Sequence, residues 1–209
     1  MAKSSDEKGK LFVISGPSGT GKGTICNELI AAAQPDELCL SISVTTREPR
    51  KGEQDGVNYY FITEDEFSEL RENGGLLEFA EVYGHHYGTP KQKVLDKLNA
   101  GTDVILEIEM QGALKVRKSY PDGVFIFVLP PSMEELRNRI TGRGTETEED
   151  IDYRLSQALS EIAYIDKYDY AVVNDELDEA VERIRAIIKA EHSKVTENIY
   201  DLIEQYKED

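Results

Sequence analysis

The feature that most constrains the fold is an apolar run near the start of the chain that ends in a glycine-rich loop. Residues Leu11 to Ser15 read LFVIS, a short run typical of a strand buried in a parallel sheet. A helix is expected from Lys22 to about Ala33, before Pro35. A loop lies between the strand and the helix. This loop, together with the first turn of the helix, contains Gly16, Pro17, Ser18, Gly19, Thr20, Gly21, Lys22, Gly23 and Thr24. A strand, a glycine-rich loop and a helix in this order predict the first unit of an α/β fold.

This loop has the residue types of a phosphate-binding loop. Glycines let backbone N–H groups turn inward around phosphate oxygens, and the helix N-terminus adds the positive end of a dipole. Lys22 supplies a mobile cation for the β- and γ-phosphates of a nucleotide. An ordinary glycine turn is the alternative, but the spacing, the lysine and the flanking elements favour phosphate binding. Gly23 stands where the usual pattern has Ser or Thr, so Mg2+ is expected to be held through water or by a carboxylate elsewhere.

The rest of the chain alternates between predicted strands and helices, with one change of texture. Residues 45–89 contain several tyrosines and glycines, short strand-like runs, and one helix with Thr63 and Glu66 at capping-box spacing. Further strands are expected at 38–44, 104–108, 124–129 and 170–173, and helices at 112–120, from 132, at 151–162 and at 177–188. This order predicts an α/β fold with a P-loop, a doubly wound parallel sheet core, and an inserted small mixed α+β subdomain.

The expected domain organisation follows from the same pattern. Residues 1–9 are expected to form a disordered lead-in, residues 10–189 one domain, and residues 190–209 a helical C-terminal extension. Within the domain, the core takes residues 10–44 and 90–189, and the insert takes residues 45–89. A polar connector flanked by glycines, at about residues 142–150, is expected to act as a helical lid.

Composition limits the partners and the compartment. The net charge of −17 makes nucleic acid an unexpected partner, because the bulk field of the chain repels a polyanion. The two cysteines, Cys26 and Cys39, have no CxxC spacing, which fits a reducing compartment. Met1 to Lys10 is polar, so no secretory signal is expected, and no apolar run approaches the ~18 residues that span a membrane. The expected location is therefore cytoplasmic, away from the membrane.

Two clusters of arginines stand against this acidic background. Arg137, Arg139, Arg143 and Arg154 surround the polar connector, where they can close on a polyphosphate. Arg47 and Arg50 project from one loop and, with Tyr59 and Tyr87, can grip a second phosphate. For both clusters the alternative is an ordinary surface, with the arginines paired to nearby acids or placed in a turn.

Five ordered segments carry a resemblance to the guanylate kinases. They are GPSGTGKGT, SVTTREPRKGEQDGVNYYF, LLEFAEVYGHHYGT, LEIEMQG and RITGRGTETEEDIDYRL, and the likeness extends from about Lys10 to about Lys189. The resemblance implies that ATP and GMP are the substrates and that Mg2+ accompanies ATP. It implies that the γ-phosphoryl group of ATP moves to GMP, giving ADP and GDP, and that dGMP is also an acceptor.

The same resemblance implies a role for each matching residue. The implied ATP-binding residues are Gly16 to Thr24, and the implied catalytic residues are Lys22, Arg139, Arg143 and Arg154. The implied GMP-binding residues are Ser43, Arg47, Arg50, Tyr59, Glu78, Tyr87, Thr89 and Glu109, with Glu78, Thr89 and Glu109 beside the guanine. Family members often have Asp-Ile-Asp where this chain has Glu107-Ile108-Glu109, and Glu107 is the candidate to orient Mg2+ through water.

Two other functions stay open at this point. One is a non-catalytic binding module on the same fold, which should lack a working phosphate loop, whereas this chain has Gly16, Gly21 and Lys22. The other is a kinase for a different nucleoside monophosphate, against which Glu78 and Glu109 argue through the resemblance alone. The sequence gives no oligomeric state.

Overall fold

Residues 8–82, 84–141, 147–195, 203, 206 and 207 are described by a computed structural model of the chain. The main sheet has five strands, all parallel, in the order β2-β7-β1-β8-β9. They are β1 (Leu11–Ser15), β2 (Leu38–Leu40), β7 (Asp103–Glu107), β8 (Val124–Leu129) and β9 (Tyr170–Val173). This sheet confirms the predicted parallel core, and β1, β8 and β9 have the expected bounds.

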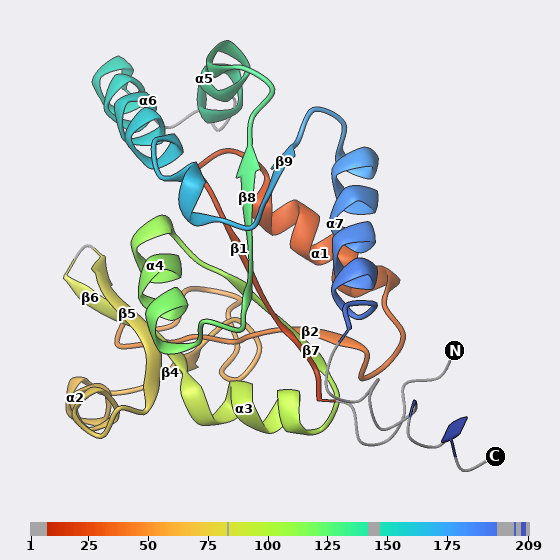
Figure 1. The fold of residues 1–209 in the computed structure, drawn as a ribbon. Coiled ribbons are helices and arrows are strands. Elements are labelled where there is room, and N and C mark those ends of the chain that lie inside the picture. Colours follow the sequence, from red (N-terminus) through yellow and green to blue (C-terminus); the bar gives the residue numbers. More distant parts are fainter. Residues whose placement is uncertain (1–7, 83, 142–146, 196–202, 204–205, 208–209) are drawn as a thin grey trace.

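Helices cover both faces of the main sheet, as Figure 1 shows. Successive residues of a strand point to opposite faces, and in β1 both sets are apolar. Phe12 and Ile14 belong to the core shared with α1 (Lys22–Ala32) and α7 (Leu177–Glu191). Leu11 and Val13 belong to the core shared with α3 (Lys91–Asn99) and α4 (Met110–Ser119). The fold is therefore doubly wound, and ligands of such sheets bind beyond the carboxyl ends of the strands.

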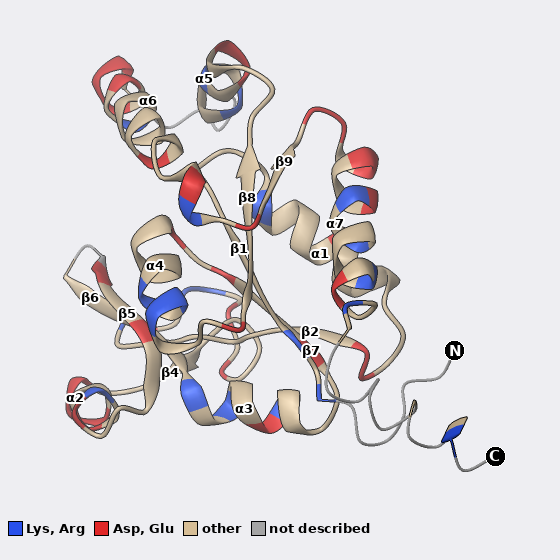
Figure 2. Ribbon diagram, in the orientation of Figure 1, with Lys and Arg blue, Asp and Glu red and all other residues tan. Residues whose placement is uncertain are grey.

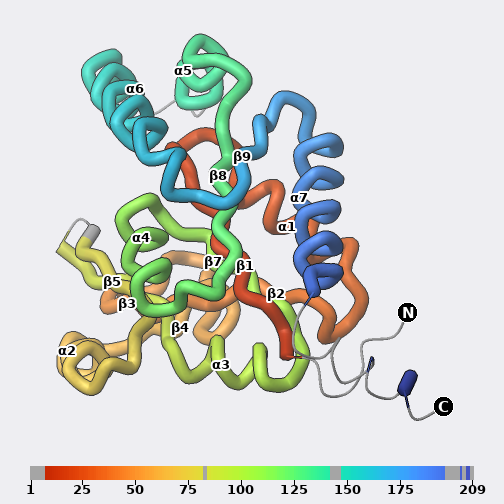
Figure 3. The backbone as a smooth tube through the Cα atoms, viewed as in Figure 1, coloured from red at the N-terminus to blue at the C-terminus, as the bar shows by residue number. Residues whose placement is uncertain are grey.

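A second, smaller sheet is inserted into this core. Its order is β4-β3-β6-β5, with β3 parallel to β4 and antiparallel to β6, and β5 antiparallel to β6. Its elements are β3 (Val44–Thr45), β4 (Tyr60–Phe61), α2 (Glu64–Glu72), β5 (Leu76–Val82) and β6 (His85–Pro90). The chain leaves β2 for this sheet and returns to the core through α3 (Figure 3). The mixed strand directions agree with the prediction, and so does the capping box of α2.

Two more helices, α5 (Met133–Thr141) and α6 (Glu148–Ile162), pack on each other and have their own small core. A short 3-10 helix, η1 (Ile165–Lys167), then leads to β9. α6 begins three residues earlier than the expected Ile151, because Thr147 and Asp150 form a capping box. Of the lid expected at about 142–150, residues 142–146 lie outside the described residues, and 148–150 are the first turn of α6.

The predicted strand over residues 38–44 is wrong, because that segment divides between the two sheets. β2 ends at Leu40, and residues 41–43 connect it to β3. Val44 pairs with Tyr60 and Gly88 of the second sheet rather than with β7. No helix is predicted over residues 91–99, yet α3 lies there, with Val94 and Leu98 one turn apart and buried in the core.

Only parts of the two ends of the chain belong to the described residues. The N–H of Gly9 donates to the carbonyl of Leu98 at 2.7 Å, and residues 1–7 of the expected lead-in lie outside the described residues. The helix expected after about Lys189 also falls largely outside them, while α7 runs to Glu191. In the described ranges, no helix combines the length and apolar character that crossing a bilayer requires.

Candidate active site

The glycine-rich loop lies between β1 and α1, at the carboxyl end of the central strand. Gly16, Gly19 and Gly21 have φ angles of 139°, 91° and 88°, a region that favours glycine. A Cβ on Gly16 would lie 2.3 Å from the carbonyl oxygen of Val128, so no side chain fits there. The loop therefore approaches β8 closely and leads into the N-terminus of α1, which is the geometry of an anion site.

Lys22 closes this loop from its C-terminal side. Its Nζ donates to the carbonyl oxygens of Gly16 at 2.5 Å and Pro17 at 2.9 Å. An open cleft of about 250 Å³ adjoins the loop. The residues that line it are Gly16, Ser18, Lys22, Glu107, Ile108, Glu109 and Glu161. Lys22 thus lines a cleft that it shares with the phosphate loop and three glutamates.

Glu107, at the carboxyl end of β7, is the carboxylate that faces the start of α1. A Cβ on Gly23 would lie 3.4 Å from its Oε1, so glycine at this position leaves room for the carboxylate. Burial raises the pKa of Glu107, and Lys22 lowers it. Among the residues that the structure describes, no cluster of three or more His, Cys, Asp or Glu side chains has the arrangement of a metal site. One carboxylate beside a phosphate loop fits Mg2+ held mainly by phosphates and water.

Glu109 directly precedes α4 and is its N-cap residue. Its carboxylate accepts hydrogen bonds from the backbone N–H of Gln111 at 2.8 Å and of Gly112 at 2.7 Å. These two N–H groups have no partner within the helix, so the carboxylate satisfies them and also meets the positive end of the helix dipole.

We expect the Glu109→Ala variant to lose this cap. The free energy of unfolding should fall by about 1 kcal/mol, the usual cost of removing an N-cap side chain. Urea unfolding of the purified variant measures this loss. Glu109→Asp is the matched control, because aspartate is a preferred N-cap residue and should preserve stability. Equal stability of the alanine variant and the parent protein would show that the cap contributes nothing.

Glu78 and Thr89 face Glu109 from the second sheet. Glu78 on β5 is 7% exposed, and its Oε1 accepts a hydrogen bond of 2.7 Å from the hydroxyl of Thr89 on β6. Burial raises the pKa of Glu78, and the hydrogen bond from Thr89 lowers it. A Cβ on Gly112 would lie 2.9 Å from Glu78 Oε2 and 3.4 Å from Glu109 Oε1. The structure therefore brings Glu78, Thr89 and Glu109 together around the start of α4.

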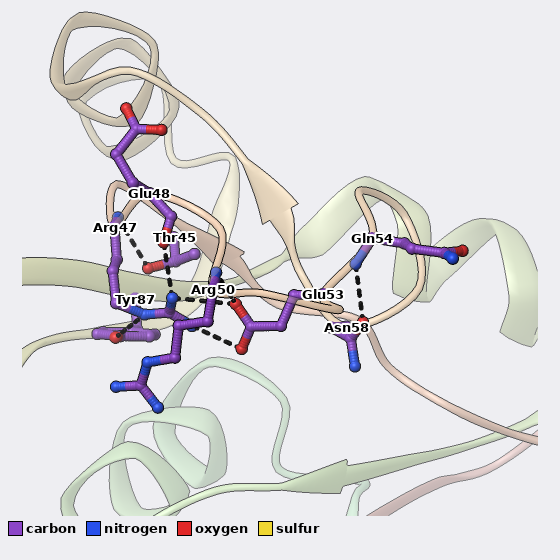
Figure 4. A network of polar contacts seen from close by, with 8 residues as sticks. All are labelled: Thr45, Arg47, Glu48, Arg50, Glu53, Gln54, Asn58 and Tyr87. Carbon is purple, nitrogen blue, oxygen red and sulfur yellow. Dashed lines mark hydrogen bonds and ion pairs between the residues drawn. The ribbon is translucent and has the colours of Figure 1, made fainter.

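Arg47 is held in place by the second sheet and its loop (Figure 4). Its Nε donates to the hydroxyl of Tyr87 at 3.2 Å, and Nη1 and Nη2 each donate to the carboxylate of Glu53 at 3.0 Å. The ring of Tyr59 lies below the guanidinium, with its centroid 5.6 Å from Cζ. The hydrogen bonds to Glu53 raise the pKa of Arg47, so the group stays charged.

Arg50 lies beside this group, whereas Ser43 contacts the strand β4. The backbone N–H of Arg50 donates to Glu53 at 2.7 Å, and the exposed side chain extends from the same loop in Figure 4. Ser43 is in the connector between β2 and β3, where its carbonyl accepts from the N–H of Tyr60. The residue that the sequence analysis missed is Glu53, although it lies within one of the five segments. No spacing in the sequence distinguishes Glu53 from the other acids near Arg47.

Loss of the Glu53 charge should weaken the grip of this arginine loop on an anionic substrate. In the Glu53→Gln variant, the side chain of Arg47 and the N–H of Arg50 can donate only to a neutral amide oxygen at position 53. Hydrogen bonds to a neutral acceptor are weaker, so the loop should be less firmly held. We expect the Kd of a phosphate monoester for this loop to rise by about two- to tenfold. Calorimetry measures this effect. Glu48→Gln, an exposed neighbour, is the matched control, and equal Kd values in the two variants would contradict the prediction.

The second cluster of arginines is partly paired with acids. Arg139 on α5 donates to the carboxylate of Glu135 at 2.8 Å and to the carbonyl of Asn174 at 3.0 Å. Arg137 is paired with Glu148 and Asp152 of α6, as the surface alternative expects. Figure 2 shows acidic residues along α6. Arg154, also on α6, is half-buried, and Arg143 lies outside the described residues.

A glycine-rich loop on a doubly wound sheet, with an arginine group and a buried carboxylate on an inserted sheet, defines a P-loop nucleotide-binding protein. The family model described as guanylate kinase matches residues 8–191. The guanylate kinase of Caldanaerobacter subterraneus subsp. tengcongensis is 58% identical over 192 residues, which cover 92% of each chain. That of Clostridium tetani is 56% identical, over 90% of this chain and 89% of the relative. The chain belongs to the guanylate kinase family.

A solved structure agrees with this assignment. The guanylate kinase from Anaplasma phagocytophilum superposes with a TM-score of 0.71 and is 37% identical in sequence. The similarity covers 91% of this chain and 89% of that protein. The similarity therefore includes the inserted sheet and the helices as well as the nucleotide-binding core.

Proposed function

We propose that this chain transfers the γ-phosphoryl group of ATP to GMP, giving ADP and GDP, and to dGMP, giving ADP and dGDP. The observation that carries the proposal is the buried carboxylate of Glu78 in the inserted sheet. Thr89 of the same sheet donates a hydrogen bond to it, and Glu109 at the start of α4 lies beside it. Guanine offers two kinds of donor, N1–H and the N2 amino group, on one edge, and a carboxylate accepts from both. Adenine has no donors in this arrangement, so AMP would leave the buried carboxylate unpaired at a large cost.

The phosphate of GMP binds to the arginine loop of the inserted sheet. Arg47 is already oriented by Glu53, and Arg50 extends from the same loop. Ser43, Tyr59 and Tyr87 supply hydroxyl groups around them. Arginine suits this task because its planar fork matches the oxygens of a phosphate and stays charged. The insert, residues 45–89, is in this proposal the GMP-binding subdomain.

The phosphates of ATP bind to the glycine loop, residues 16–24. Lys22 leaves the loop carbonyls and contacts the β- and γ-phosphates instead. Arg139 of α5, Arg154 of α6 and Arg143, which lies between these helices in the sequence, contact the same phosphates. The reaction requires alignment and neutralised charge, with no covalent intermediate on the protein. Mg2+ supplies additional positive charge at the phosphates when bound, and Glu107 would hold its water shell. Because ATP and GMP are cytoplasmic metabolites, we place the enzyme in the cytoplasm.

A coupled assay of ADP formation with GMP, dGMP, AMP, CMP and UMP tests the proposal. We expect turnover with GMP and dGMP, and kcat/KM values lower by roughly 10²-fold or more with the other acceptors. Efficient turnover of another nucleotide would assign the chain to a different acceptor. No turnover with any nucleotide, in folded protein that binds GMP, would indicate a non-catalytic binding module.

A further inference from the structure

Asn174 joins three parts of the site that are far apart in the sequence. It follows β9 directly and is 6% exposed. Its backbone N–H donates to the carbonyl of Leu129 at the end of β8, at 2.8 Å. Its side-chain Nδ2 donates to the carbonyl of Thr20 in the glycine loop, also at 2.8 Å. Its own carbonyl accepts the hydrogen bond from Nη1 of Arg139 at 3.0 Å.

The hydrogen bond to Thr20 determines how one peptide group of the loop is oriented. In a trans peptide the C=O and the next N–H point in opposite directions. With the Thr20 carbonyl held toward Asn174, the N–H of Gly21 points the other way, away from the β9 side. Gly21 has a φ of 88° and a glycine peptide flips at little steric cost, so the loop alone specifies this orientation weakly.

The contact is also close enough to exclude other residues. A Cβ on Gly21 would lie 2.5 Å from Asn174 Nδ2. Glycine at position 21 therefore serves two purposes: it permits the positive φ, and it admits the asparagine amide against the loop. Gly19 is similarly in contact with α5, since a Cβ there would lie 3.1 Å from Leu136 Cδ1.

The third contact reaches the helix that carries Arg139. Because Nη1 of Arg139 donates to the Asn174 carbonyl and Nε donates to Glu135, the guanidinium is held on two sides. Asn174 thus contacts a loop peptide through its side chain and, through its backbone carbonyl, an arginine that is proposed to approach the ATP phosphates. From this geometry we propose that Asn174 is a positioning residue, which sets the glycine loop and Arg139 in register for the polyphosphate.

This inference rests on the proposed function, and its test separates binding from transfer. Asn174→Asp keeps the size and the backbone contacts but places an acceptor against the Thr20 carbonyl. We expect the Kd of a non-hydrolysable ATP analogue, measured by calorimetry, to rise at least about tenfold, as for a lost buried hydrogen bond. The Kd of GMP should stay within about twofold, because its proposed site is in the inserted sheet. In steady state, the KM of ATP should rise and kcat should fall.

Two further variants make the result decisive. Asn27→Asp on the exposed side of α1 introduces the same charge and should bind both ligands like the parent protein. Asn174→Ala removes the donor without a buried charge and decides the question if the aspartate variant fails to fold. Unchanged affinity for the ATP analogue, or equal losses for the ATP analogue and GMP, would overturn the proposal. If the parent protein binds the analogue but does not phosphorylate GMP, the proposed function fails while the role of Asn174 in binding stands.

Discussion

The Lys22→Met variant is expected to fold and to lose phosphoryl transfer by about 10²- to 10³-fold or more in kcat. Removal of one preorganised charge at the reacting group typically has an effect of this size. In the structure the ammonium reaches the Gly16 and Pro17 carbonyls across the mouth of the loop, where the transferred phosphate is proposed to lie. Methionine has an unbranched side chain only one heavy atom shorter than lysine, so the surrounding packing should persist.

Kinetics with saturating ATP and GMP, together with circular dichroism, measure this effect. Lys118→Met, an exposed position on α4, is the control for loss of one positive charge. A Lys22→Met enzyme with the kcat of the parent protein would show that the glycine loop does not hold the transferred phosphate.

The Glu78→Gln variant is expected to lose its discrimination for guanine. Glutamine has the same shape, and its carbonyl oxygen still accepts the hydrogen bond from Thr89. Its NH2 group, however, is a donor, so it cannot form a hydrogen bond with the N–H donors of guanine. A hydrogen bond to a charged group contributes about 1.5–3 kcal/mol, so the KM of GMP should rise by roughly tenfold or more. The ratio of kcat/KM for GMP to that for AMP should fall by a similar factor.

The change should be specific to the acceptor site. At saturating GMP, the KM of ATP should be the same in the variant and the parent protein. Stability should not fall, because burial raises the pKa of Glu78 and so disfavours its charged form in the folded state. An unchanged KM for GMP would remove Glu78 from the guanine site and the main support for guanine recognition.

Much of the core was predictable because its signals are local. β1, the glycine loop and α1 are contiguous, and their apolar, glycine and lysine residues each indicate one element. β8 and β9 are apolar runs bounded by turns, so their ends could be read from the sequence. The capping box at Thr63 and Glu66 similarly located α2.

The errors arise where tertiary pairing overrides a local pattern. Residues 38–44 alternate like one strand, but β2 pairs with β7 while β3 pairs with β4 and β6, and no local feature marks the change of sheet. In α3 only Val94 and Leu98 are buried among polar and lysine residues, so the apolar stripe is narrow and no element was predicted there from the sequence. α6 begins early because its cap, Thr147, lies in a polar stretch that resembled a loop.

The sequence indicated candidate site residues but not the contacts between them. The resemblance indicated Glu78, Thr89 and Glu109, and the structure brings them together, yet it also shows Glu109 as a helix cap. Glu53 was missed because nothing in the sequence says which acid meets Arg47. The hydrogen bond between Asn174 and Thr20 joins residues 154 positions apart, a pairing that only the folded sheet creates.

The most direct test is to mix GMP and excess enzyme with ATP that carries a label in its γ-phosphate, and to measure where the label goes. We expect the label to move into GDP, with one ADP formed for each labelled GDP, and we expect AMP in place of GMP to receive almost none. Label released as inorganic phosphate, retained on the protein, or transferred equally well to AMP would contradict the proposed function.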